Sequence, residues 1–319
     1  MLNWKKRGLI YSPTLYPPLA NGVGFAQSPQ TLVFEDYVRI FFSTRERDAQ
    51  DGKFVSRVCY VDMDKSLQEV IRVSPSPVIG PAELGAFDEH GIFPFNVLRH
   101  EGKIMAWTTG WNRRVSVSVD TAIGLAISED EGESFTRIAT GPVMAASLHE
   151  PHLVGDAFVL HLNGSFHMWY IFGTGWKKPS AVAVPERIYK IAHAISDNGI
   201  DWRRDSKTII EPFLGDDECQ ALPTVIQTGD RYHMVFCFRE CFDFRRGGGR
   251  GYRLGYAWSQ DLQVWHRDDS QVASLCSKDE WDSEMQCYPH LFRCDGKVYL
   301  LYNGNAFGKE GFGLAEMIL

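Results

Sequence analysis

The sequence predicts an all-β protein: a single five-bladed β-propeller over residues 1–319, with four antiparallel strands in each blade. Three observations support this prediction. An apolar segment centred on a proline recurs at an even period, and each copy continues into further strand-like segments. The start of the chain also supplies a strand that the last copy lacks. Helical periodicity is nearly absent, which is typical of an all-β chain.

The first strand of each repeat is marked by a proline or by the residue in its register. These positions are Pro29, Pro94, Ala157, Pro223 and Pro289, spaced 65, 63, 66 and 66 residues apart. Self-similarity at a fixed period is the sequence signature of a repeat architecture. We therefore assign one propeller blade to each copy.

Each copy continues in the same way. A hairpin turn such as Asn163-Gly164 or Asp295-Gly296 leads into a second strand. The five second strands are expected at 37–42, 103–107, 166–170, 231–236 and 297–302. Third strands rich in Gly and Ala follow at 123–128, 191–196, 254–259 and 312–315. An aromatic residue after a turn, such as Trp202 or Trp265, then opens a fourth strand.

The fifth copy reaches Leu319 with only three strands. The segment from Trp4 to Pro13 resembles the predicted fourth strand from Trp202 to Pro212. The N-terminal segment is therefore expected to complete the last blade and close the ring. Closure would remove an open sheet edge, which otherwise invites aggregation.

Composition and charge restrict the classes of partner that this protein can bind. The net charge is −7, and no clustered basic stripe of the kind that binds a phosphate backbone is present, so no nucleic-acid partner is expected. The seven cysteines match no zinc spacing, and neither a metal nor another cofactor is predicted. No segment is long enough to span a membrane. These features favour a cytoplasmic protein.

The basic loop of Arg245, Arg246, Arg250 and Arg253 is either a solvated loop or a lid over an anionic ligand.

Ligand-binding groups are expected just before each proline-register position and just after each second strand, because the first strand starts at the face of the ring where the second strand ends. Four carboxylates at such positions are the catalytic candidates: Glu218, Asp88, Glu89 and Glu284. Carboxylates that converge on one channel raise the pKa of some members, which lets one site hold an acid and a base. Glycoside cleavage needs such a pair. The alternative is that each acid is a turn residue that accepts backbone hydrogen bonds.

The candidate substrate-binding residues are Arg45, Trp111, His152, Trp176, Gln220, Arg239, Asp282, Gln286 and Asn303. The tryptophans could stack on a sugar face, while the arginines and amides could bind hydroxyl, carboxylate or phosphate groups. Two alternatives stay open. The arginines could neutralise the acids as ion pairs, and His152 could be structural.

Several segments resemble the five-bladed propellers of glycoside hydrolase families 32, 43, 68 and 130. More closely, they resemble glycosidase-like proteins encoded among surface-polysaccharide biosynthesis genes. The most specific are Trp281-Asp282-Ser283-Glu284-Met285 and the run from Leu301 to Gly313, and the weaker ones include Phe41-Phe42-Ser43-Thr44-Arg45 and the run from Gly85 to Gly91. The pair Glu218-Cys219 is similar to the acid/base motif of family 32. The first repeat has no acid where family 43 places its base, and the family 32 nucleophile motif is missing.

The resemblance implies a glycosidase-like enzyme of cell-surface polysaccharide (O-antigen or capsule) metabolism. Glu218 would be the acid, Asp88 or Glu89 the base or nucleophile, and Glu284 a tuning or binding group. A cytoplasmic location would imply a nucleotide-linked or lipid-linked sugar as the substrate. Two alternatives remain: a phosphorylase or transferase acting on a phosphorylated sugar, and a carbohydrate-binding propeller without catalysis.

Overall fold

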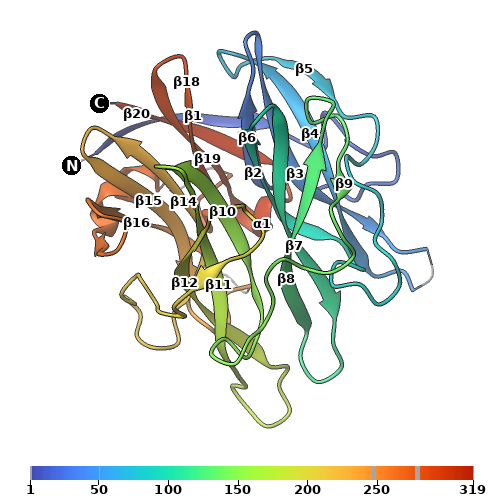
Figure 1. Cartoon of the computed structure of the whole chain (residues 1–319), viewed down its shortest axis with the longest axis vertical. Helices are drawn as coiled ribbons and strands as arrows, with labels where there is room; N and C mark the ends of the chain where they lie inside the picture. The colour runs from blue at the N-terminus through green and yellow to red at the C-terminus, as the bar shows by residue number, and fades with distance from the viewer. Residues whose placement is uncertain (1, 50, 246–248, 277–280, 319) are drawn as a thin grey trace.

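The computed structural model describes residues 2–49, 51–245, 249–276 and 281–318. It consists of five four-stranded antiparallel sheets arranged as the blades of a ring (Figure 1). The innermost strands β2, β6, β10, β14 and β18 each contact the next around the axis, and β18 returns to β2. The predicted five-bladed propeller is thereby confirmed. Within the described residues, no helix has the length and apolar character that a membrane crossing requires.

The first three blades follow the chain in order. Blade 1 contains β2 (Gln27–Val33), β3 (Tyr37–Arg47), β4 (Phe54–Asp64) and β5 (Val70–Val73). Blade 2 contains β6 (Ile92–His100), β7 (Lys103–Arg113), β8 (Val119–Ser128) and β9 (Thr136–Arg137). Blade 3 contains β10 (Val154–Leu162), β11 (Ser165–Lys177), β12 (Glu186–Ser196) and β13 (Arg203–Arg204).

Blade 4 contains β14 (Cys219–Thr228), β15 (Arg231–Arg239), β16 (Arg253–Ser259) and β17 (His266–Arg267), followed by the 3₁₀ helix η1 (Asp269–Leu275). Blade 5 contains β18 (Cys287–Cys294), β19 (Lys297–Asn303) and β20 (Phe312–Ile318), with the short turn α1 (Asn305–Gly308) before β20. The fourth strands of blades 2 to 4 are only two residues long, much shorter than the predicted segment 202–212. An outermost strand has a neighbour on one side only, so little holds a longer segment in the sheet.

The N-terminal strand β1 (Asn3–Tyr11) completes blade 5, as the sequence predicts. It pairs antiparallel with β20, and Trp4 lies opposite Met317. The Trp4 indole is 6% exposed and packs between blades 4 and 5. Its Nε1 donates to the carbonyl oxygen of Gln271 in η1 at 2.9 Å. The first and last strands of the chain therefore close the ring together.

The repeated proline position marks a β-bulge. All five innermost strands shift register there, between residues 27 and 30, 92 and 95, 155 and 158, 221 and 224, and 287 and 290. The residue before the repeat position has a positive φ at Ser28, Asp156, Leu222 and Tyr288. A bulge breaks the simple alternation of side chains and redirects one of them. The repeat thus carries a feature that aims side chains toward the axis.

The hydrophobic core lies between neighbouring blades. Phe41 of blade 1 meets Phe95 and Phe135 of blade 2, with ring centroids 5.7 Å apart in both pairs. Trp107 of blade 2 is fully buried and packs against Phe166 and Trp202 of blade 3. Because each blade buries its faces only against its neighbours, an incomplete last blade would expose the core of the ring.

We predict that Trp4→Ala destabilises the protein by about 3–5 kcal/mol, because it removes a buried indole and leaves a cavity where the ring closes. Urea denaturation measures the change. Leu9→Ala on the same strand is the control, since Leu9 is 38% exposed and should have little effect. Equal losses in both variants would contradict a role for Trp4 in closure.

Candidate functional site

A central pocket of about 460 Å³ opens at one end of the ring. Its walls come from residues next to the starts of the innermost strands, the ends of the second strands and the starts of the third strands. This is the end at which the sequence places the ligand-binding groups. The volume lies within the usual range for small-ligand sites. The pocket is large enough for a small saccharide.

The bulges supply part of the pocket wall. Phe93, Asp156, Leu222 and Tyr288 all precede the repeat position, and all four line the pocket. Positive φ is uncommon for residues other than glycine and is least unfavourable for Asn and Asp. Three of these four hold such a conformation, including a leucine and a tyrosine. Backbone strain of this kind concentrates at functional sites.

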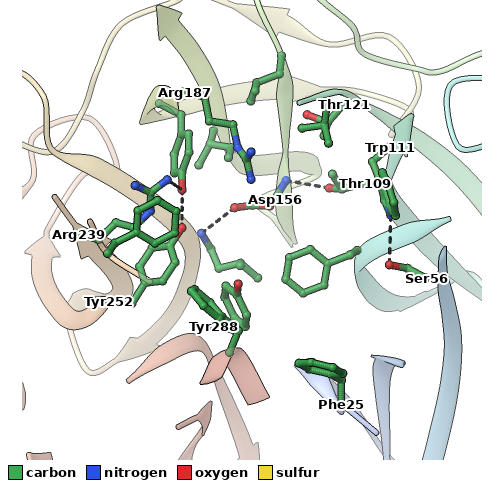
Figure 2. Close-up of a pocket in the computed structure, with 18 of the residues that line it drawn as sticks. Phe25, Ser56, Thr109, Trp111, Thr121, Asp156, Arg187, Arg239, Tyr252 and Tyr288 are labelled. Atoms are coloured by element: carbon green, nitrogen blue, oxygen red, sulfur yellow. Dashed lines mark hydrogen bonds between the residues drawn. The ribbon is translucent and has the colours of Figure 1, made fainter. Parts of the chain in front are cut away.

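Asp156 is the only acidic side chain among the described residues that line the pocket. Its backbone N–H donates to Thr109 Oγ1 at 2.8 Å, and its Oδ2 accepts from the backbone N–H of Leu222 at 3.2 Å (Figure 2). Burial raises the pKa of Asp156 to about 7, although the Leu222 hydrogen bond and the nearby Arg187 oppose the shift. Asp156 can therefore hold or release a proton near neutral pH.

Four arginines line the same pocket: Arg45, Arg187, Arg239 and Arg245. Arg245 pairs with Glu186 at 2.5 Å. The other three form no ion pair with any carboxylate of the described chain. Arg45 Nε donates to Gln27 Oε1 at 2.9 Å, and Arg187 Nη1 donates to Ser118 Oγ at 3.4 Å. A pocket with three unpaired guanidinium groups and one carboxyl group favours an anionic ligand.

Arg239 is the most enclosed of these cations, with 1% of its surface exposed. Its Nη1 donates to the carbonyl oxygens of Glu240 and Cys241 at 2.8 and 3.1 Å, and its Nη2 donates to Tyr189 Oη at 3.0 Å. Its Nε has no hydrogen-bond partner in the described chain. A buried charge is strongly unfavourable unless it is compensated. The carbonyl dipoles and the Phe244 ring, 3.5 Å from the guanidinium carbon, supply part of that compensation.

Aromatic side chains form most of the remaining wall. Tyr189 and Tyr252 hydrogen-bond to each other through their hydroxyl groups, and burial raises the pKa of both, so both stay protonated at neutral pH. Trp111 is half-buried and donates from Nε1 to Ser56 Oγ at 3.1 Å (Figure 2). Rings at the edge of a polar pocket can stack on the apolar face of a sugar. Arg45, Trp111 and Arg239 are thus the predicted binding residues that the structure brings together.

Most of the predicted acids lie elsewhere, in ion pairs that we call the blade latches. In four blades, a buried acid before the innermost strand pairs with a cation on the outermost strand of the same blade. The pairs are Asp88–Arg137 at 2.7 Å, Glu150–Arg204 at 2.5 Å, Glu218–Arg267 at 2.7 Å and Asp282–Lys6 at 2.9 Å. None of these four acids lines the pocket. Blade 1 has no such acid, and Arg72 of β5 instead pairs with Asp62 of β4 at 2.7 Å.

The Glu218 carboxylate is saturated by its neighbours. Its Oε2 accepts from the backbone N–H groups of Phe213 and Leu214 at 2.8 and 2.9 Å, and its Oε1 accepts from Gln220 Nε2 at 2.9 Å in addition to Arg267. The sequence left two alternatives open: that the acids accept backbone hydrogen bonds as turn residues, and that arginines neutralise them as ion pairs. Glu218 makes contacts of both kinds. The catalytic roles given to Glu218 and Asp88 stay predictions.

The remaining predicted residues also lie outside the pocket wall. Gln286 Nε2 donates to Asp282 at 2.9 Å, and the buried Asn303 bonds the backbone of Ser28, Ala26 and Gly311. Glu89 and His152 are half-buried, Trp176 packs against the core of blades 3 and 4, and Glu284 is exposed. In the basic loop, Arg250 bonds the carbonyl of Phe242 and Arg253 pairs with Glu240, whereas Arg246 lies outside the described residues.

Sequence reasoning missed Asp156, Arg187 and the tyrosines of the pocket. A signal for Asp156 was present, because it directly precedes the repeat position in the one copy that has alanine in place of proline. Arg187 and Tyr189 lie at the start of the third strand β12, whereas the sequence predicts site residues only near the first and second strands. Among the described residues, no group of three His, Cys, Asp or Glu side chains could hold a metal ion.

We predict that Arg267→Met destabilises the protein by about 3–5 kcal/mol, because it leaves the Glu218 carboxylate buried without its cation. Urea denaturation at pH 7 measures the loss. The double variant Glu218→Gln/Arg267→Met should recover part of the stability, since it removes both charges. Arg203→Met, at an exposed ion pair on the neighbouring blade, should cause no measurable change. A loss in the double variant as large as in Arg267→Met would contradict the latch.

We predict a pH-dependent stability difference at Asp156. Its folded pKa of about 7 lies above the unfolded value near 3.9, so the folded state binds the proton more tightly. Its contribution to stability is fully present below about pH 4 and is lost as the pH rises to about 7, by an amount on the order of 4 kcal/mol. Asp156→Asn should remove this loss, as measured by urea denaturation from pH 4 to 8. The exposed Asp230→Asn is the control, and parallel profiles of Asp156→Asn and the native protein would contradict the shift.

Comparison with known proteins gives two relatives of nearly equal length, which have the same identity to this chain: the "Uncharacterized protein MT1551" and the "Uncharacterized protein Rv1502" of two Mycobacterium tuberculosis strains. The chain is 29% identical over 315 residues to the "Uncharacterized protein Rv1502" of Mycobacterium tuberculosis (strain ATCC 25618 / H37Rv), with 98% of this chain and 99% of the relative covered. No protein-family model matches the chain.

Solved structures show the same architecture. A structure titled "Glycoside hydrolase" aligns with a TM-score of 0.71 at 17% identity, over 98% of this chain and 90% of that one. A thermostable family-43 glycoside hydrolase gives 0.65 at 14% identity, over 95% and 91%. A structure from a study of mannoside phosphorylases and β-1,2-mannoside hydrolases of family 130 gives 0.66 at 13%, over 99% and 93%. The chain thus has the five-bladed propeller fold of glycoside hydrolases such as those of families 43 and 130.

Proposed function

We propose that this protein is a glycosidase-type enzyme that cleaves or transfers a glycosyl unit in its central pocket, and that its substrate or co-substrate is an anion. The observation that carries the proposal is that Asp156 lines the same pocket as Arg45, Arg187 and Arg239, none of which forms an ion pair with a carboxylate of the described residues. The fold shared with glycoside hydrolases supports the reaction class. The charges of the pocket support the class of ligand.

Asp156 is the proposed general acid. Breaking a glycosidic bond to an alcohol requires a proton on the leaving oxygen. A carboxyl group can supply that proton at neutral pH only if its environment raises its pKa, and burial does this for Asp156. In the view of Figure 2, Asp156 lies between Tyr252 on one side and Trp111 on the other, and all three residues line the pocket. A saccharide bound between these walls would contact the carboxyl group.

The arginines are the proposed anion-binding group. Guanidinium groups bind carboxylate and phosphate oxygens through charge-assisted hydrogen bonds. Three hydrogen bonds hold the Arg239 guanidinium group in place. The Arg45 guanidinium group lies over the Phe25 ring, with its Cζ 4.6 Å from the ring centroid. An anion in the pocket would compensate the charge of these groups and displace their water. A sugar carboxylate or a phosphate group fits this description.

Phosphorolysis is a second candidate that a specific observation favours. Hydrolysis by the usual route needs two carboxyl groups, and Asp156 is the only acid among the described residues lining the pocket. In phosphorolysis an oxygen of inorganic phosphate attacks the anomeric carbon. The glycosidic C–O bond breaks, and Asp156 gives its proton to the leaving oxygen. The products are a sugar phosphate and the released alcohol, so no second carboxyl group is required.

We further propose that the reaction belongs to cell-surface polysaccharide metabolism, such as that of O-antigen or capsule. A cytoplasmic enzyme of this kind would act on a sugar attached to a nucleotide or a lipid. Both carriers contain phosphate, which is the chemistry that the arginines would bind. This setting rests on the sequence resemblance and on the charge of the pocket.

The test is a turnover assay on disaccharides and on 4-nitrophenyl glycosides, each with and without phosphate. Asp156→Asn should slow disaccharide cleavage by roughly 10²–10⁴-fold, because the general acid is lost. It should affect 4-nitrophenyl substrates less, since their leaving group needs no proton. Glu218→Gln is the comparison and should retain turnover per folded molecule. Normal activity of Asp156→Asn together with an inactive, folded Glu218→Gln would reverse the two roles. Turnover that requires phosphate would select phosphorolysis.

A further inference from the structure

Exposed apolar side chains gather at the pocket end of the ring. Seven large apolar residues of the described chain are at least 69% exposed: Leu15, Leu84, Val115, Leu148, Val182, Val184 and Phe213. All seven lie in loops that join a second strand to a third or one blade to the next, which are the loops at the pocket end. At the opposite end, Ile200, Val264 and Ile318 are 42%, 56% and 43% exposed. Exposed apolar groups concentrated on one face indicate an interaction surface.

Two neighbouring hairpins carry the clearest part of this surface. The β7–β8 hairpin turns at residues 114–118 and the β11–β12 hairpin at 178–185, and both project beyond the rest of the ring at the bottom of Figure 1. Each has a tryptophan, two adjacent cations and exposed valine at its end. The sequences are Trp111-Asn112-Arg113-Arg114-Val115 and Trp176-Lys177-Lys178, the latter followed by Val182 and Val184. No acidic residue lies between 112 and 119 or between 174 and 185.

The cations at these ends are available to an external anion. Arg114 and Lys177 have side chains 55% and 53% exposed and are paired with Asp120 and Asp217. Lys178 is exposed and forms no ion pair with the described residues. Exposed ion pairs contribute little in water, so a lipid phosphate can replace their carboxylate partners at small cost.

We propose that the hairpins β7–β8 and β11–β12 dock on an anionic lipid surface, with Val115, Val182 and Val184 entering the headgroup region. Exposed apolar side chains flanked by cations are a combination that binds at a membrane interface. The basic groups would bind lipid phosphates, whereas Trp111 lines the pocket and Trp176 packs against the core, so neither takes part in the docking. A symmetric contact with a second copy would instead place these like charges near each other, which disfavours it.

The same hairpins form part of the pocket wall, through Trp111 and Val119 on one and Arg187 and Tyr189 on the other. Docking would therefore hold the pocket mouth beside the lipid surface. A sugar attached to a lipid could then reach Asp156 without leaving the membrane. This consequence rests on the proposed function, whereas the docking itself does not.

The experiment measures co-sedimentation of the protein with vesicles of phosphatidylcholine alone or with about 30% phosphatidylglycerol. We expect binding to the anionic vesicles, little binding to neutral ones, and weakening at about 0.5 M NaCl, where charges are screened over a few ångströms. Val182→Asp/Val184→Asp should weaken binding at least tenfold, because burial of each valine is replaced by a charge that anionic lipid repels. Lys178→Glu with Arg114→Glu should do the same at low salt.

Ile200→Asp/Val264→Asp is the matched control, since it adds two charges at exposed apolar sites on the opposite end of the ring. This variant should bind anionic vesicles as the native protein does. Unchanged melting temperatures show that the variants are folded. The proposal is overturned if the native protein does not bind anionic vesicles, or if the control variant loses binding equally. It is also overturned if the valine variant only abolishes a dimer seen by light scattering. Because vesicle binding needs no turnover, its failure would leave the pocket chemistry untouched.

Discussion

The antiparallel pairing of β1 with β20 is the constraint on which the molecule depends. Each blade is a twisted sheet that buries its faces only against its two neighbours, so the hydrophobic core exists only when the ring is complete. Blade 5 takes three strands from the C-terminal end of the chain and one from the N-terminal end. Closure therefore couples the first strand to the last, and the pocket on the axis depends on that coupling.

Carboxylates occupy two kinds of position in the blades, and their surroundings differ. The buried acids before the innermost strand turn outward into blade latches, where half-buried cations on the outermost strand pair with them. They tie the inner and outer strands of a blade together through one desolvated ion pair. The residue at the bulge turns inward, and in blade 3 it is Asp156. Asp156 forms no ion pair with the described residues, and burial raises its pKa, as its proposed role as an acid requires.

The pocket and the two projecting hairpins form one functional end of the molecule. The third blade contributes Asp156 through its inner strand, Arg187 and Tyr189 through its third strand, and exposed Val182 and Val184 through the connecting loop. The strands β11 and β12 are 13 and 11 residues long, while β19 and β20 of blade 5 have seven each. The extra length extends the wall of the pocket and carries the hairpin end beyond the ring. One elongated blade thereby supplies Asp156, Arg187 and the exposed valines, the groups to which the proposed catalysis, anion binding and docking are assigned.

The sequence alone determined the number of blades, the closing strand and the end of the ring at which the pocket lies, because these follow from strand period and antiparallel connection. The sequence also contains a signal for the blade latches. In each of the four blades that have the buried acid, a cation stands two positions after an aromatic residue; the aromatics are Trp4, Phe135, Trp202 and Trp265. Only the tertiary structure decided which carboxylate faces the axis. A β-bulge shifts the direction of a side chain by one residue, and strand alternation cannot predict that shift. The bulge of blade 3 places Asp156 in the pocket wall, whereas Glu218 lies before the bulge of blade 4 and faces Arg267 instead.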